Sequence, residues 1–80
     1  MHNIAMNEII LTLNALIKNY KKIDFVVSEN SVSTGVFSVH KEGAKKYSFG
    51  IVNDRFALQE IGQRKAEEFY FLAKSRCPIR

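Results

Sequence analysis

Residues 23–53 read IDFVVSENSVSTGVFSVHKEGAKKYSFGIVN, and this stretch decides the fold. Apolar and polar side chains alternate in it over three runs, at about 23–29, 32–40 and 47–53, as in strands with one buried face. Polar connections that carry turn residues separate the runs. Three short strands joined in this way predict a three-stranded antiparallel meander.

The predicted meander has one large apolar face. The first hairpin would pair Phe25 with Phe37, and the second would pair Val39 with Tyr47. A slip of one residue in either hairpin would mix the two faces, so this register is the consistent one. We expect the core face to consist of Ile23, Phe25, Val27, Phe37, Val39, Tyr47, Phe49 and Ile51.

Amphipathic helices are predicted on both sides of the strands. Apolar residues recur at intervals of three and four from about 4 to 21 and again from about 55 to 75. Gly62 has two readings. It either lets the second helix lie close to the sheet, or it breaks that helix and leaves a main part over 63–75.

Residues 1–80 are therefore expected to form one small α+β domain of order α-β-β-β-α, with a short basic C-terminal tail. A three-stranded sheet with one apolar face needs a layer over that face. Both helices carry a suitable apolar stripe. The predicted architecture is a two-layer sandwich with both helices on one face.

Composition narrows the function classes. The chain is 46% hydrophobic, which is too apolar for a disordered protein, and it has no run of about 18 apolar residues that could span a membrane. No basic segment precedes an apolar one at the N-terminus, so no secretory signal is expected. The single cysteine, Cys77, fits a reducing compartment. We expect a cytoplasmic protein of a bacterial or phage-infected cell.

Residue spacing indicates no catalytic or metal site. His2, His40 and Cys77 show none of the spacings of a metal site. No nucleophile motif and no phosphate-binding loop occurs. His40 falls on the outward face of a strand without a positioned partner, so we expect it to be a surface histidine. The chain is predicted to be neither an enzyme nor a cofactor binder.

The even-numbered face of the sheet would stay open because both helices cover the other face. It would be nearly uncharged and moderately apolar, which is typical of partner sites, although Val, Thr and Ser are also ordinary strand residues. Gly50 inside a strand can mark the close approach of another backbone or a ligand. We predict that a protein partner or a second copy binds this face or its open edge through Val26, Thr34, Val36, Ser38, His40, Ser48, Gly50 and Val52.

The net charge of +4 is ordinary for a soluble domain, but the lysines are grouped. In a three-stranded meander the end of the first helix and the loop over 41–46 would meet at one end of the sheet. Such a pole would suit phosphates or an acidic protein surface, although lysines at a helix end and in a solvated loop are also expected. The pole would contain Lys18, Lys21, Lys22, Lys41, Lys45 and Lys46.

Two families resemble the chain in organisation. The order α-β-β-β-α resembles the double-stranded-RNA-binding domain, and residues 63–67, QRKAE, are similar to the basic start of its last helix. The Lys-Lys-x-Ala-Lys spacing and the Gly-Pro-x-His loop of that family are absent, so its RNA-contacting residues are not assigned here. A single small helix–meander–helix domain also resembles phage-encoded inhibitors such as anti-CRISPR and anti-restriction proteins.

The second resemblance implies a non-catalytic protein that occupies the surface of a host protein. Many such inhibitors are acidic mimics of nucleic acid, and the positive charge of this chain departs from that pattern. We therefore expect an inhibitor of a phage or mobile element that binds a protein directly. The alternative is a nucleic-acid-binding module that uses the basic pole, which steep salt dependence would reveal.

Overall fold

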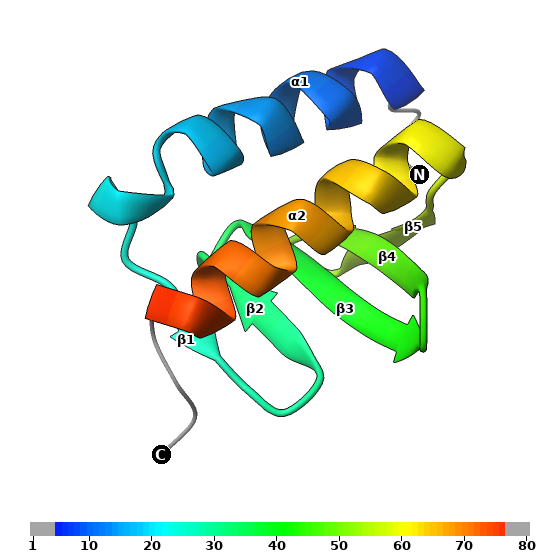
Figure 1. Cartoon of the computed structure of the whole chain (residues 1–80). Coiled ribbons are helices and arrows are strands. Elements are labelled where there is room, and N and C mark those ends of the chain that lie inside the picture. Colours follow the sequence, from blue (N-terminus) through cyan, green and yellow to red (C-terminus); the bar gives the residue numbers. More distant parts are fainter. Residues whose placement is uncertain (1–4, 77–80) are drawn as a thin grey trace.

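The computed structural model describes residues 5–76 and shows an α+β fold with two helices and a five-stranded antiparallel sheet (Figure 1). The expected α+β class is confirmed, but the expected three-stranded sheet is wrong. In chain order the elements are α1 (Met6–Lys18), the 3-10 turn η1 (Tyr20–Lys22), β1 (Val26–Val27), β2 (Ser31–Ser33), β3 (Phe37–Gly43), β4 (Lys46–Ile51), β5 (Asp54–Ala57) and α2 (Glu60–Arg76). The strands lie in the sheet in this same order.

Some expectations fall on residues outside the described range. They are the first residues of the predicted N-terminal helix, His2, Cys77 and the basic tail over 77–80.

The run over 32–40 is not one strand, because the chain reverses at residues 34–36. Gly35 has a φ of 98°, a conformation that favours glycine. The Thr34 hydroxyl accepts the Phe37 N–H at 3.0 Å, and the Thr34 N–H donates to the Phe37 carbonyl at 2.7 Å. The reversal pairs Val32 with Val39 and buries both completely. Val32 is thus a core residue that was not among the eight predicted for the core face.

The segment expected to begin the last helix forms the edge strand β5 instead. Ile51 pairs with Asp54 across a two-residue turn, and Phe56 pairs with Phe49. Phe49 is fully buried, and Phe56 packs partly buried against the core. The first turn residue, Val52, has a φ of 55°, which is rare for a β-branched side chain.

The last helix begins at Glu60 and continues through Gly62 without a break. A Cβ built on Gly62 would lie 3.1 Å from Cδ2 of Leu58 and 3.5 Å from Sδ of Met6. The contact with Leu58 in the preceding loop is tight, and the contact with Met6 of α1 is an ordinary van der Waals contact. The helix therefore does not break at Gly62, and the close contacts of this glycine are with the preceding loop and α1 instead of the expected sheet.

The residues of the core face are as predicted, although the register between β3 and β4 differs from the expected one. Val39 pairs with Phe49, two residues from the expected Tyr47, and Phe37 pairs with Ile51. A shift of two leaves each side chain on its original face, because the side-chain period of a strand is two. All eight residues predicted for the core face are buried or packed against the buried core.

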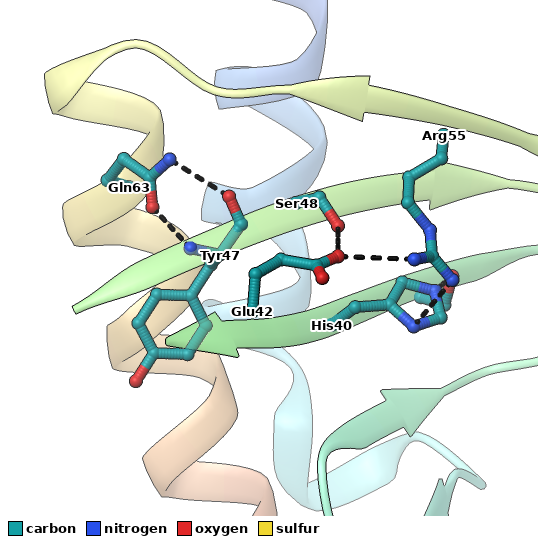
Figure 2. A network of polar contacts seen from close by, with 7 residues as sticks. His40, Glu42, Tyr47, Ser48, Arg55 and Gln63 are labelled. Atoms are coloured by element: carbon teal, nitrogen blue, oxygen red, sulfur yellow. Dashed lines mark hydrogen bonds and ion pairs between the residues drawn. The ribbon is translucent and has the colours of Figure 1, made fainter. Parts of the chain in front are cut away.

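Both helices lie on the same side of the sheet, behind it in Figure 2. The buried residues of α1 are Ile9, Leu13 and Leu16, and α2 buries Gly62, Ala66, Phe69, Tyr70 and Ala73. Arg76 donates to the carbonyls of Tyr20 at 2.6 Å and Ile23 at 2.8 Å, which ties the end of α2 to the chain that follows α1. Within residues 5–76 no helix is long and apolar enough to cross a membrane.

Gln63 supplies the backbone partners that β4 lacks where β5 ends. Its Oε1 accepts the Tyr47 N–H at 2.6 Å, and its Nε2 donates to the carbonyls of Tyr47 at 2.9 Å and Leu58 at 3.1 Å (Figure 2). One amide side chain therefore replaces a strand at this point and fixes α2 against the sheet.

Val52→Asn is expected to raise the free energy of unfolding by about 1 kcal/mol, because asparagine tolerates a positive φ that costs a β-branched residue about that much. Val36→Asn is the matched control, since Val36 is also exposed and also lies in a turn, but its φ is not positive. Urea unfolding followed by circular dichroism measures both. Equal effects of the two substitutions would show that Val52 carries no backbone strain.

Candidate functional site

The outer face of the sheet, away from the helices, carries a network of polar side chains (Figure 2). Ser48 donates its hydroxyl proton to Oε1 of Glu42 at 2.7 Å, and Nη1 of Arg55 donates to the same oxygen at 3.1 Å. Arg55 comes from β5, the strand that the alternation pattern did not reveal. The expectation of a nearly uncharged face is therefore wrong, since a carboxylate and a guanidinium lie across it.

His40 has a defined tautomer in this network. Its Nδ1 lies 3.2 Å from Nη2 of Arg55, and its Nε2 lies 2.9 Å from Oγ of Ser38. A guanidinium can only donate, so Nδ1 must accept. The neutral ring then carries its proton on Nε2 and donates it to Ser38. In this state His40 has no lone pair facing Ser38 and is not arranged to activate that hydroxyl as a nucleophile.

The two titratable groups of the network shift in the same direction for different reasons. Burial lowers the pKa of His40 below its usual value; the positive charge of Arg55 lowers it further, and Glu42 opposes both effects. The hydrogen bond from Ser48 lowers the pKa of Glu42, and Arg55 adds to that shift. At neutral pH the network therefore holds a neutral imidazole, a carboxylate and a guanidinium.

Gly50 makes room for this network. A Cβ built on Gly50 would collide with Oγ of Ser38 and lie 3.4 Å from Nε2 of His40. Gly50 and Ser38 face each other across β4 and β3. The close approach that a strand glycine signals is made here by two side chains of the neighbouring strand.

The eight residues predicted for the partner surface separate into two groups. Val26, Ser38, His40, Ser48 and Gly50 lie on strands, and of these Ser48 and Gly50 are buried. Thr34, Val36 and Val52 lie in the turns that the sequence pattern did not reveal. The large exposed side chains of the set are its three valines, Val26 at 69%, Val36 at 53% and Val52 at 71%.

Two of these valines lie side by side at one end of the sheet. The N–H of Val52 donates to the carbonyl of Val36 at 2.8 Å, which joins the 34–36 turn to the turn after β4. Val26 pairs with Ser33, the last residue before the first of these turns. We call Val36 and Val52 the valine corner. It is an exposed apolar point on a fixed backbone.

The six lysines predicted to form one pole lie in separate places. Val26 pairs with Ser33 and Ser33 with Ser38, so β1 begins at the end of the sheet near the 34–36 turn. Lys45 lies in the β3–β4 turn at the opposite end. Figure 1 shows η1 in cyan and the β3–β4 turn in green far apart on the molecule. Lys18, Lys21 and Lys22 therefore do not join Lys41, Lys45 and Lys46 at one pole.

The distance between the two lysine groups can be estimated along helix α2. Lys21 borders a hollow with Leu72 and Ser75, whereas Lys45 borders one with Gln63 and Glu67. Gln63 and Ser75 are twelve residues apart on α2, which is about 18 Å of helix. With one unbroken strand over 32–40, the chain would reverse only once between the start of the first strand and the loop over 41–46, so both would lie at the same end of the sheet. The turn at 34–36 adds a second reversal, which places them at opposite ends.

Comparisons with protein-family models, curated proteins and solved structures give no match to this chain. Among residues 5–76 no three His, Cys, Asp or Glu side chains gather closely enough to hold a metal ion.

The pKa of His40 is expected to lie below 6.5 in the folded protein and to move back toward 6.5 in Arg55→Gln, which removes a positive charge beside the ring. NMR titration of the His2→Gln background, which leaves one imidazole, measures this pKa.

The lowered pKa of His40 also makes the stability of the fold depend on pH. The unfolded chain binds the proton first as pH falls, so the contribution of the neutral ring is complete above about 6.5 and is lost below it. A folded-state pKa above 6.5 would contradict the assigned effects of burial and of Arg55 on this ring.

Proposed function

We propose that this protein is a non-catalytic binding protein that docks on a protein partner through the valine corner. The observation that carries the proposal is Val52, a β-branched residue held at a φ of 55° with 71% of its surface exposed. Because Val52 is exposed, its side chain adds little to the hydrophobic stabilisation of the fold, while its backbone conformation costs free energy. Strain of this kind at an exposed position is typical of contact sites.

The neighbouring backbone supports docking by a preformed surface. The hydrogen bond between Val52 and the Val36 carbonyl fixes the two turns relative to each other. A partner that covers both side chains would not have to order these loops first, which reduces the entropic cost of association. Covering the corner would gain about 25 cal/mol per Å² of apolar area.

The polar network beside the corner favours binding over catalysis. His40 is engaged at both ring nitrogens, and its tautomer directs a proton toward Ser38. Glu42 is engaged by Ser48 and Arg55. These contacts support a rigid face with a polar rim beside an apolar centre, the usual composition of a protein interface.

An inhibitor from a phage or mobile element that occupies a host protein's surface is the form of this function that we favour. A single rigid corner on a small domain suits such an inhibitor, because an inhibitor of this kind acts by covering a surface of its target. We place it in the cytoplasm, where the lone Cys77 would stay reduced.

Val36→Lys should abolish partner binding without lowering the melting temperature, because it places a charge at the centre of the corner on an exposed turn. Leu11→Lys is the matched control, since Leu11 is 65% exposed on α1 and lies outside the corner. Proteins captured from host lysate by the wild type and by Leu11→Lys, but not by Val36→Lys, are the predicted result. Sedimentation of the free protein tests whether the partner is a second copy.

Equal capture by all three proteins, with equal sedimentation, would contradict a docking site at the valine corner.

A further inference from the structure

A second exposed feature lies on the helical side of the molecule. Phe71 of α2 is 54% exposed, although it is a large aromatic side chain. Its ring meets the ring of Tyr70 edge-on, with centroids 5.8 Å apart and planes at 85°. Tyr70 is buried and also packs on Tyr47, with centroids 5.4 Å apart. Phe71 is therefore the outermost ring of an aromatic stack that is anchored in the core.

Two lysine ammonium groups flank these rings. Nζ of Lys41 lies 5.9 Å from the ring centroids of both Tyr70 and Phe71, and Nζ of Lys74 lies 5.1 Å from the centroid of Tyr70. A distance of 5.9 Å is near the outer limit of a cation–π contact, so Lys41 is weakly held and free to meet an anion. Lys74 donates to the Glu29 carbonyl at 3.1 Å, which keeps its ammonium beside the rings.

The charges along α2 are polarised around Phe71. Glu67 and Glu68 precede it by one helical turn, and Lys74 follows it by nearly one turn. Lys41 approaches from β3. Within one turn of Phe71 the carboxylates thus lie on its N-terminal side and the cations on its C-terminal side and on the sheet, whereas Arg64 and Lys65 lie earlier on the helix. An anionic ligand that contacts both Lys41 and Lys74 would pass beside the rings of Tyr70 and Phe71.

We infer that this face binds single-stranded nucleic acid, with one base stacked on Phe71 and the adjoining phosphates on Lys41 and Lys74. An exposed ring flanked by cations is the combination used for single strands, because every base offers a π-face and every nucleotide a phosphate. A duplex would not use the ring, since its bases are already stacked. An acidic peptide would use the ammonium groups but would leave the aromatic ring unexplained.

This inference concerns a different surface from the valine corner. Phe71 lies on the helical layer, and Val36 lies in a turn at one end of the sheet. Each site can be lost while the other is kept.

Anisotropy of fluorescein-labelled dT12 at low salt tests the inference. The wild type should bind dT12 more tightly than an abasic chain of the same length, more tightly than a dT12·dA12 duplex and more tightly than an acidic peptide of equal charge. The log–log salt slope should be about −1.4 for two phosphate contacts to a single strand. Phe71→Ala should weaken dT12 binding by roughly 5- to 150-fold, the loss expected for one stacked base, whereas Phe71→Tyr should retain it.

Lys41→Gln should weaken binding and reduce the magnitude of the salt slope by about 0.7. Ile61→Ala is the matched control, since Ile61 is also a large exposed side chain of α2, and it should bind as the wild type does. Val36→Lys should likewise retain dT12 binding. Circular dichroism confirms that each variant is folded.

Three results would overturn the inference: no binding of dT12 by the wild type at low salt, equal affinity for the abasic chain or the acidic peptide, or unchanged affinity in folded Phe71→Ala.

Discussion

The reversal of the chain at residues 34–36 is the constraint on which the rest of the structure depends. Gly35 adopts a positive φ, and the Thr34 hydroxyl accepts the N–H of Phe37, so the turn is closed by local contacts. Because the reversal adds one strand, β1 enters at the end of the sheet opposite the β3–β4 turn. The same turn separates the two groups of lysines and exposes Val36 next to Val52.

The two faces of the sheet differed in how well the sequence predicted them. The core face depends on alternation, which tolerates a register shift of two, so Val39 and Phe49 were assigned correctly with the wrong partners. Val32 was not recognised as a core residue because Ser33-Thr34-Gly35 is compatible with both a strand and a turn. Strand β5 was missed because the last helix was predicted to begin at about residue 55, within this strand, and because the turn at Val52 contains no glycine.

Side chains that act across elements were the least predictable part of the candidate site. Arg55 reaches His40 and Glu42 only because β5 exists. Gln63 pairs with the backbone of Tyr47, sixteen residues away, in place of a strand. No local spacing signals either contact. Gly50 was expected to mark the approach of another backbone or a ligand, whereas the close approach is made by the side chain of Ser38 on the neighbouring strand.

The molecule is a scaffold with two distinct exposed surfaces, the valine corner and the face around Phe71. On the outer face of the sheet the polar side chains hydrogen-bond to one another. The valine corner lies beside this network and is exposed and apolar. The helical layer presents Phe71 beside Lys41, and Lys74 lies beside the neighbouring ring of Tyr70. Both surfaces lie on backbone that the core or local hydrogen bonds fix in place, which favours recognition without rearrangement.

The most direct test of the central claim is the hydrogen bond that joins the two turns of the valine corner. A through-hydrogen-bond NMR coupling between the Val52 amide nitrogen and the Val36 carbonyl carbon measures it without mutation. The fold described here predicts a resolved coupling and slow exchange of the Val52 amide. An absent coupling, together with an amide that exchanges at the rate of an unprotected chain, would show that the second reversal and the corner it creates do not form.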